Sequence, residues 1–263
     1  MIGIVGLGKI GGAIAKNVLA SGRAMVGWAR RPESLKAFAE HGGHAAKSLA
    51  DLAAAEVVIS VVFNDEDLRE VAFGSAGLVQ IMRPGAVHVA METISPSLAR
   101  ELHDAHALRG QSFLAAPVFG RPEAALLGQL AIMCSGPDET FHAVDAILST
   151  AGRTQWIGPE PEQAMLVKLI GNHMILTVGE LLAEVFTFLD AGGVGAKTTR
   201  SALLDDLMPR VFSGYVQRLA DDPGGERPAS TSIGRKDTAL VIQAARDLGV
   251  GLALAHRIHT ARG

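Results

Sequence analysis

The chain has 263 residues, of which 48% are hydrophobic and 19% charged, and its formal net charge is −3. This composition supplies a large apolar core and excludes an intrinsically disordered protein, while the nearly balanced charge gives no sign of a nucleic acid partner. The single cysteine, Cys134, excludes an internal disulfide and agrees with a cytoplasmic location, which we expect for this protein.

The first half of the chain alternates short β-branched runs with helical segments, a pattern typical of parallel strands joined by crossover helices. No basic segment precedes the first expected strand, so no signal peptide is expected. Turns are expected at Pro84-Gly85 and Gly136-Pro137. The expected strands cover residues 2–5, 24–27, 57–62, 86–91, 112–115 and 130–135, and the expected helices cover 10–21, 33–40, 66–73 and 96–106.

The second half changes character, because no strand is expected after about residue 160. One long helix is predicted over 162–190, ending before Gly192-Gly193, and further helices near 197–206 and 233–248 flank a Pro/Gly-rich loop at 223–225. Charged residues interrupt the most apolar stretch, so no membrane span is expected. We therefore predict an α/β fold with a Rossmann-type parallel sheet domain over 1–160 and an all-helical domain over 161–263, which begins with a long interdomain helix.

The long predicted helix is unusually apolar. Its polar residues at 168, 172, 180 and 184 form one narrow stripe, and the other faces carry mostly Leu, Ile, Val, Met and Phe. A small helical domain does not cover that much apolar surface. We therefore expect a homodimer in which a second subunit covers this helix.

A glycine motif, Gly6-Leu7-Gly8-Lys9-Ile10-Gly11, directly follows the first expected strand and begins the first expected helix. In a G-x-G-x-x-G turn the first glycine makes the tight turn, the second admits a pyrophosphate, and the third lets helix and strand pack closely. The N–H groups of the helix N-terminus attract phosphate. This context favours a dinucleotide site over a purely structural turn.

The end of the second expected strand points to the type of dinucleotide. An NAD site places an acidic residue here to bind the ribose 2′-hydroxyl, whereas this chain has Ala29 followed by Arg30 and Arg31. A guanidinium pairs well with a 2′-phosphate. We predict NADP, with NAD as the less favoured cofactor; a solvated basic turn is the alternative reading of the two arginines.

With this motif upstream, Lys168-Leu169-Ile170-Gly171-Asn172 on the long helix makes the chain resemble the β-hydroxyacid dehydrogenase family. That family includes 3-hydroxyisobutyrate and 6-phosphogluconate dehydrogenases and is related to the imine reductases. The resemblance covers essentially the whole chain and includes Met91-Glu92-Thr93-Ile94-Ser95-Pro96, Ala116-Pro117-Val118-Phe119-Gly120-Arg121 and Lys236-Asp237. It implies cofactor contacts at Val62, Phe63, Asp67, Thr93 and Lys236, and substrate contacts at Glu92, Phe119, Gly120, Arg121 and Asp237.

Lys168 and Asn172 are the predicted catalytic residues. They are one helical turn apart and project from the same face. A lysine desolvated in a cleft can donate a proton to a carbonyl oxygen that receives a hydride, and Asn172 would orient that oxygen. Gly171 would permit close approach of cofactor, substrate or another helix. The structural alternative is a lysine reaching solvent and an ordinary helical asparagine.

Three departures from the family pattern concern the substrate. Phe119 stands where the family has a serine that binds a carboxylate, Arg121 replaces a glycine, and Glu92 replaces another serine. Phe119 removes a donor and Glu92 would repel a carboxylate, whereas Arg121 either replaces the lost charge or lies on the surface. The motifs thus predict an NADP-dependent oxidoreductase acting on a small carbonyl or hydroxyl group. An imine reductase is the alternative, and a non-catalytic NADP-binding sensor is less favoured.

No metal site is expected. His103 and His106 are three residues apart on an expected helix, but no third ligand accompanies them. Solvated helical histidines are the simpler interpretation of this pair.

Overall fold

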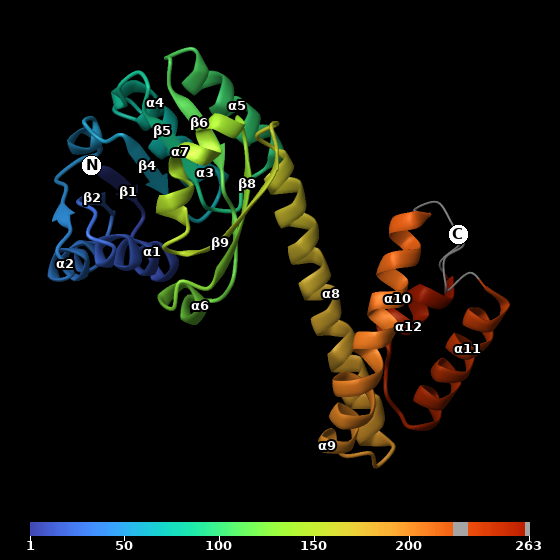
Figure 1. Cartoon of the computed structure of the whole chain (residues 1–263). Helices are drawn as coiled ribbons and strands as arrows, with labels where there is room; N and C mark the ends of the chain where they lie inside the picture. The colour runs from blue at the N-terminus through green and yellow to red at the C-terminus, as the bar shows by residue number, and fades with distance from the viewer. Residues whose placement is uncertain (223–230, 261–263) are drawn as a thin grey trace. The chain divides into compact units, whose positions relative to one another are not determined.

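The computed structural model describes residues 1–222 and 231–260, so the expected loop at 223–225 lies outside the described residues. Contacts within the chain divide it into two compact units, Met1–Asn172 and the residues from His173 onward. The domain boundary that the sequence predicts, between residues 160 and 161, lies before the division between residues 172 and 173. Helix α8 (Gln163–Ala191) spans that division (Figure 1). The two units are described separately.

The first unit is built on a nine-stranded sheet in which β3-β2-β1-β4-β5-β6 are parallel neighbours. This is the strand order of the Rossmann fold. β8 then pairs antiparallel with β6 and β7, and parallel with β9. The strands are β1 (Ile2–Val5), β2 (Met25–Trp28), β3 (His44–Ala45), β4 (Val57–Ser60), β5 (Val87–Ala90), β6 (Ser112–Ala115), β7 (Val118–Phe119), β8 (Leu130–Ser135) and β9 (Gly152–Gly158).

The central strands are buried along their whole length. Every residue of β1, β4 and β5 is buried, which explains why these segments are almost continuous apolar runs. Two polar residues interrupt them, Ser60 at the end of β4 and His88 in β5, and both are completely buried. Because a buried polar group needs a hydrogen-bond partner, these two side chains identify a polar network inside the sheet.

Helices flank this sheet and connect its strands. Pro at the first turn of α2, α5 and α6 fixes where these helices begin. Asn64 caps α3 by accepting a hydrogen bond from the Asp67 N–H at 2.9 Å. The helical segments of this unit are α1 (Lys9–Ala20), α2 (Pro32–Glu40), η1 (Leu49–Leu52), α3 (Asp65–Phe73), α4 (Leu78–Ile81), α5 (Pro96–Ala107), α6 (Pro122–Leu126), α7 (Asp138–Leu148) and the beginning of α8.

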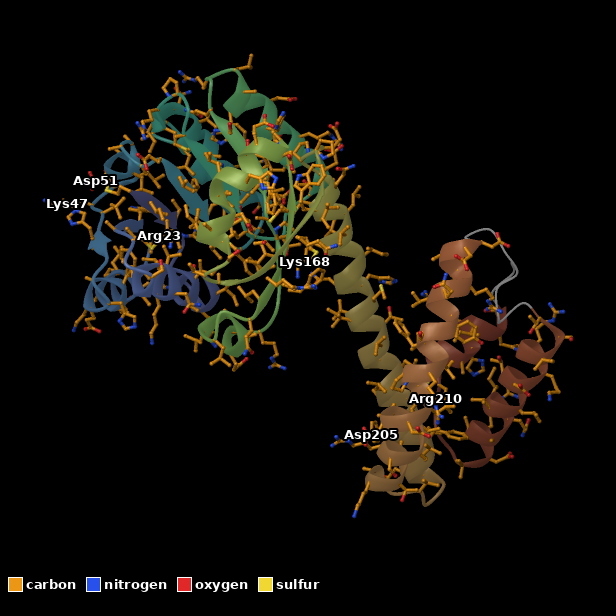
Figure 2. The ribbon with its side chains drawn as sticks, in the orientation of Figure 1. Arg23, Lys47, Asp51, Lys168, Asp205 and Arg210 are labelled. Atoms are coloured by element: carbon orange, nitrogen blue, oxygen red, sulfur yellow. The ribbon has the colours of Figure 1, made fainter. Side chains whose placement is uncertain are left out.

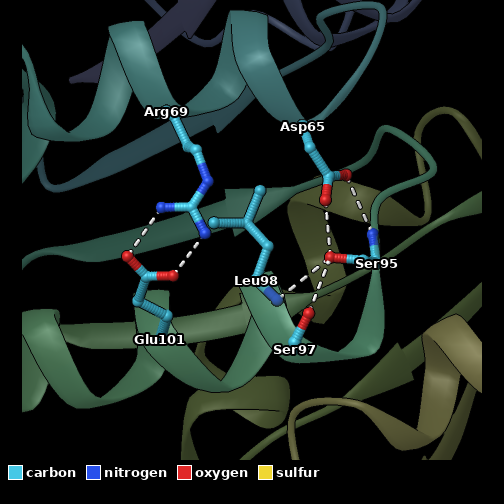
Figure 3. Close-up of polar contacts among 6 residues, drawn as sticks. All are labelled: Asp65, Arg69, Ser95, Ser97, Leu98 and Glu101. Carbon is cyan, nitrogen blue, oxygen red and sulfur yellow. Dashed lines mark hydrogen bonds and ion pairs between the residues drawn. The ribbon is translucent and has the colours of Figure 1, made fainter.

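Polar contacts join α3 to α5 beside the carboxyl ends of β4 and β5 (Figure 3). The Asp65 carboxylate accepts bonds from the Ser95 N–H at 2.9 Å and the Ser95 hydroxyl at 2.5 Å. Farther along the two helices, Arg69 donates two bonds to Glu101 at 2.7 and 2.5 Å. These contacts fix the connections that leave both strands.

The elements expected in the first half are present, with boundaries shifted by up to two residues. The strands β3, β7 and β9 and the helices α4, α6, α7 and η1 were not expected from the sequence. Strands of two residues show no period, and β9 lacks a regular inside–outside alternation. Helix α7 begins directly after Pro137, where a turn alone was expected.

The regular secondary structure of the second unit is entirely helical in its described residues. The long predicted helix is confirmed as α8, with 29 residues. Glu184 of α8 accepts a 2.7 Å bond from the Leu254 N–H, which ties α8 to α12. None of the described helices is long and apolar enough to cross a membrane. Besides α8, the segments are α9 (Ala196–Thr199), the π-helical η2 (Arg200–Leu207), α10 (Met208–Asp221), α11 (Ser232–Asp247) and α12 (Ala253–Thr260); the sequence analysis missed α10 and α12.

Candidate functional site

A cavity of about 840 Å³ opens at the carboxyl ends of β1, β2 and β4. The strand order reverses between β1 and β4, which is where open α/β sheets bind their ligands. Most lining residues come from the turns after these three strands, from α3 and from the loop after α3. They include Gly6, Leu7, Gly8, Lys9, Ile10, Gly11, Arg30, Arg31, Val62, Phe63 and Asp67.

The three glycines of the motif differ in their surroundings. Gly6 has φ +89°, and a Cβ there would lie 2.2 Å from the Val61 carbonyl oxygen. A Cβ on Gly11 would lie 2.0 Å from the Gly6 oxygen, whereas a Cβ on Gly8 meets nothing within 4 Å. Gly6 and Gly11 are therefore required by the chain's own packing. Gly8 borders open space, as an approaching pyrophosphate requires.

The N-terminus of α1 faces this cavity. Gly8 is its N-cap residue, and no side chain among the described residues caps the helix. The first helical bond runs from the Gly12 N–H to the Gly8 oxygen at 2.7 Å. The N–H groups of the first turn, together with the helix dipole, favour an anion here. The site therefore fits the diphosphate of a dinucleotide.

The end of β2 carries the two arginines. Arg30 Nη1 lies 2.9 Å from Asp67 Oδ1, and its side chain is 66% exposed. Arg31 is also exposed and lines the cavity, and it forms no ion pair with any described residue. Trp28 and Ala29 complete this part of the lining, so the end of β2 itself carries no acidic residue of the kind that binds the ribose 2′-hydroxyl in an NAD site. A free guanidinium suits a 2′-phosphate.

The β4 side of the cavity contains Val62 and Phe63, and the Phe63 side chain is 87% exposed. Thr93 is half-buried and does not line the cavity. Its neighbour Glu92 is only 4% exposed. The Glu92 carboxyl lies 2.9 Å from the Ser60 hydroxyl and 3.3 Å from the Val62 N–H, and burial raises its pKa to about 7. The bonds of this carboxyl therefore go to the interior of the sheet.

Lys168, which is labelled in Figure 2, and Asn172 form the second part of the candidate site, on α8. Lys168 Nζ donates to Asn172 Oδ1 at 2.9 Å and lies 4.0 Å from the centroid of the Phe119 ring. Lys168 is 8% exposed and forms no ion pair with any described residue. Burial lowers the pKa of its ammonium group. A proton held by such a lysine is more easily given up than that of a surface lysine.

The Phe119 ring packs against the backbone of α8 at Gly171. A Cβ on Gly171 would lie 2.5 Å from Phe119 Cζ, so the glycine admits the aromatic ring to the helix. The expectation that cofactor, substrate or another helix occupies this space is wrong, because the neighbour is a side chain of β7. The sequence analysis named both Phe119 and Lys168 but missed their contact.

The remaining predicted residues take no part in these contacts. Gly120 has φ +142°, and a Cβ there would lie 2.6 Å from Leu130 Cδ2. The Arg121 side chain is 91% exposed and 3.8 Å from Glu123, so it is on the surface. Lys236 and Asp237 pair with each other at 2.9 Å on α11 of the second unit.

Several lining residues were not found from the sequence. Ser34, Glu70 and the loop 74–77 border the cavity, and no motif marks them. The expected solvated histidine pair is also wrong for His106, which is completely buried and hydrogen-bonded to His88. Across the described residues, no group of three or more metal-ligating side chains is present.

Comparison with known proteins agrees with this geometry. The family profile described as the NAD binding domain of 6-phosphogluconate dehydrogenase matches residues 1–158. The chain is 32% identical over 257 residues to the uncharacterized oxidoreductase YfjR of Bacillus subtilis, covering 97% of this chain and 90% of that protein. It is 28% identical over 269 residues to L-threonate dehydrogenase of Cupriavidus necator, covering 98% and 88%.

The fold also matches solved structures along nearly the whole chain. An imine reductase variant from Myxococcus stipitatus, in complex with NAD+, superimposes with a TM-score of 0.87 at 17% identity, covering 99% of this chain and 91% of that one. At this identity the likeness concerns the fold alone. From the profile match and the relatives together, the chain belongs to the NAD-binding domain family of 6-phosphogluconate dehydrogenase and is an oxidoreductase of the superfamily that includes the β-hydroxyacid dehydrogenases.

Proposed function

We propose that the protein is an NADP-dependent oxidoreductase of the β-hydroxyacid dehydrogenase type, with Lys168 as its acid/base. The observation that carries this proposal is the Lys168–Asn172 pair, 2.9 Å apart on α8, in the same unit as the dinucleotide cavity. A buried lysine without a carboxylate partner is costly to keep, and such groups concentrate at functional sites. The kinship with L-threonate dehydrogenase supports chemistry on a hydroxyl-bearing substrate.

The choice of NADP rests on the end of β2. Arg31 is free to meet a 2′-phosphate, and Arg30 is restrained only by an exposed pair with Asp67. Exposed ion pairs contribute little, about 0–1 kcal/mol, so a phosphate can compete for Arg30. The open space at Gly8 and the uncapped N-terminus of α1 suit the diphosphate.

When bound, the reduced nicotinamide supplies the hydride. In this proposal Lys168 Nζ gives a proton to the substrate oxygen as charge develops there, and takes it back in the reverse direction. Asn172 Oδ1 accepts a hydrogen bond from Lys168 Nζ, so the amide hydrogens of Asn172 remain available to bind the substrate oxygen. The Phe119 ring covers one side of Nζ and limits water around it.

Imine reduction is the second candidate, and Phe119 is the observation that favours it. Its ring already holds a cation, Lys168 Nζ, at 4.0 Å, and an aromatic ring also favours the positive charge of an iminium substrate. Phe119 also stands where a carboxylate-binding serine is expected for small hydroxy acids. Phe119→Ser should improve small carboxylate substrates and weaken cyclic imines, with NADPH affinity unchanged as the control.

NADPH oxidation against small aldehydes, semialdehydes, β-keto acids and cyclic imines tests the proposal. Turnover of a carbonyl compound supports the dehydrogenase type, and turnover of imines alone favours the alternative. A non-catalytic NADP-binding sensor would bind NADPH and turn over none of these compounds. Equal affinity for NADH and NADPH would contradict the cofactor assignment.

We also propose that two copies of the chain associate through α8. This helix exposes a series of apolar side chains: Leu166, Leu169, Ile170, Met174, Ile175, Leu176, Val178 and Leu181. Burial of such residues is the main favourable term in subunit association. Light scattering should give a dimer at micromolar concentration, and Ile175→Glu should weaken it. A stable monomer of the unaltered protein would contradict this proposal.

A further inference from the structure

A chain of hydrogen-bonded side chains runs through the interior of the first unit. Ser60 on β4, His88 on β5 and His106 on α5 are all completely buried. Ser60 Oγ lies 2.9 Å from Glu92 Oε1 and 2.9 Å from His88 Nε2. His88 Nδ1 lies 2.9 Å from His106 Nε2, and His106 Nδ1 lies 2.6 Å from Gln111 Oε1. The proposed mechanism uses none of these groups.

The last member of the chain sets the direction of its bonds. Gln111 Nε2 donates to the Met82 oxygen at 2.6 Å, so Gln111 Oε1 is the acceptor and His106 Nδ1 the donor. Burial lowers the pKa of His106 to about 4 and that of His88 well below its ordinary value, so both rings are neutral at pH 7. A neutral ring has one N–H only. His88 Nδ1 therefore donates to His106, and His88 Nε2 accepts from Ser60.

The donor and acceptor at the contact between Ser60 and Glu92 follow from these assignments. The Ser60 hydroxyl has a single hydrogen, which is already given to His88 Nε2. Its contact with Glu92 Oε1 is then satisfied only when Oε1 carries a proton and donates to Ser60. Glu92 Oε2 accepts from the Val62 N–H, as the carbonyl oxygen of an acid does. Without this proton on Glu92, one contact in this series of side chains would join two acceptor atoms with no hydrogen between them.

Glu92 also lies next to the cavity, through Val62. Arg30 and Arg31 at the end of β2 indicate where the adenosine of a dinucleotide would bind, and the N-terminus of α1 indicates where its diphosphate would bind. The nicotinamide half of the dinucleotide would therefore extend toward β4 and β5. Resting on the proposed function, we propose that Glu92 is a positioning residue that keeps its proton beside the reduced nicotinamide and releases it beside the oxidised, positively charged ring.

When Glu92 loses its proton, the hydrogen bonds around it rearrange. The Glu92 Oε1–H bond breaks, the proton passes to solvent, and the Ser60 hydroxyl turns to donate to Oε1. The carboxylate would then attract the positive ring, because opposite charges at short range in a buried site attract strongly. The lost Ser60–His88 bond is the cost that keeps Glu92 neutral until that positive charge is present.

Few groups influence this titration. Burial raises the pKa of Glu92 to about 7, and the Ser60 hydroxyl and the backbone N–H groups of Glu92 and Val62 oppose that rise. No charged side chain among the described residues contributes. The titratable groups behind Ser60 are His88 and His106, with His103 acting on His106, and all three belong to β5 and α5.

The first test needs no cofactor. Nitrogen-15 NMR of the histidine rings at pH 7, assigned with His88→Asn and His106→Asn, reports which nitrogen carries the proton. We expect both rings to be neutral with the proton on Nδ1, which requires the proton on Glu92. An imidazolium at either position, or a proton on Nε2 of either neutral ring, would overturn the proton assignment.

The second test measures dissociation constants for oxidised and reduced dinucleotide at pH 6 and pH 8. The phosphates titrate alike in both forms, so their effect cancels in the ratio of the two constants. From pH 6 to 8, binding of the oxidised form should strengthen relative to the reduced form by about fivefold or more, because a one-proton linkage reaches tenfold per pH unit.

Two variants isolate Glu92 in this measurement. Glu92→Gln preserves the bonds of the neutral acid, with its amide donating to Ser60 and accepting from Val62, and its ratio should not change with pH. Glu66→Gln removes an exposed carboxylate of α3 that does not line the cavity and should keep the unaltered protein's pH dependence. A flat ratio in the unaltered protein, or a slope that persists in Glu92→Gln, would overturn the proposal. Binding of neither dinucleotide would instead contradict the proposed function, and the NMR result stands apart from it.

Discussion

The two parts of the candidate site are built in different ways. The dinucleotide cavity is made largely of backbone: two glycines that the packing requires, a third beside open space, and the uncapped start of a helix. The Lys168 region is made of side chains from distant segments, with Phe119 of β7 against α8. A backbone site is encoded in a few consecutive residues, whereas a side-chain site depends on tertiary packing.

The largest expected effect belongs to the side-chain part. Loss of general acid catalysis typically costs 10²–10⁴-fold in rate, about 3–5 kcal/mol. Lys168→Ala should therefore lower kcat by that order and leave NADPH affinity nearly unchanged, as measured by steady-state kinetics and fluorescence titration. Gly8→Ala serves as the opposite control, because it should weaken cofactor binding and leave the acid in place. Full turnover by Lys168→Ala would remove the distinction between the two parts.

The buried carboxyl of Glu92 should affect the pH dependence of stability. Glu92 has a folded pKa raised from 4.5 to about 7, so its contribution is fully present below pH 4.5 and is lost as the pH rises through 7. The free energy of unfolding should fall by on the order of 3 kcal/mol over this range relative to Glu92→Gln. Urea titrations at several pH values measure this difference.

The comparison with Glu92→Gln is needed because His88 and His106 act with the opposite sign. Their pKa values are lowered in the folded protein, so their contribution increases as the pH rises toward 6.5. Both histidines are present in the two proteins, so their effect cancels. Parallel stability curves for the two proteins would show that Glu92 is ionised throughout.

Replacing both arginines tests the cofactor preference of the backbone part. A charge-assisted phosphate contact is worth about 1.5–3 kcal/mol, so Arg30→Ala with Arg31→Ala should weaken NADPH by roughly 10- to 150-fold. NADH lacks the 2′-phosphate and should lose much less. Isothermal titration with both cofactors measures the difference. A similar loss for NADH would mean that the arginines contact groups common to both.

Substitutions of Gly8 and Gly11 have the smallest expected effects, but they should change different properties of the protein. A Cβ on Gly11 would lie 2.0 Å from a carbonyl oxygen, so Gly11→Ala should destabilise the fold by about 1–3 kcal/mol. A Cβ on Gly8 meets open space, so Gly8→Ala should keep the melting temperature and lose cofactor affinity. Thermal unfolding combined with cofactor titration separates the two. Equal destabilisation by both variants would contradict the different roles of these glycines.

The sequence predicts the parts of this molecule that depend on local patterns. The alternation of strands and helices, the long helix α8, the glycine turn and the shared face of Lys168 and Asn172 follow from spacing within one segment. The contact between Phe119 and Lys168 joins residues far apart in the chain, and no periodicity announces it.

The polar network illustrates the same limit. Ser60 and His88 lie in β4 and β5, and their contact depends on how the sheet brings these strands together and on the pairing register Ser60↔Ala90. His106 arrives from a helix, and Glu92 joins only because β5 ends two residues before it. The sequence marked Glu92 as a departure at the substrate end, but its hydrogen bonds lie inside the sheet.

The most direct test of the account is the pH profile of single-turnover reduction with the best carbonyl substrate. Burial lowers the pKa of Lys168, and reduction needs its protonated form, so the rate should fall as the pH rises through a value below the ordinary pKa of lysine. Lys168→Ala should be slow at every pH and show no such decline. A decline that persists unchanged in Lys168→Ala would contradict the assignment of Lys168 as the acid.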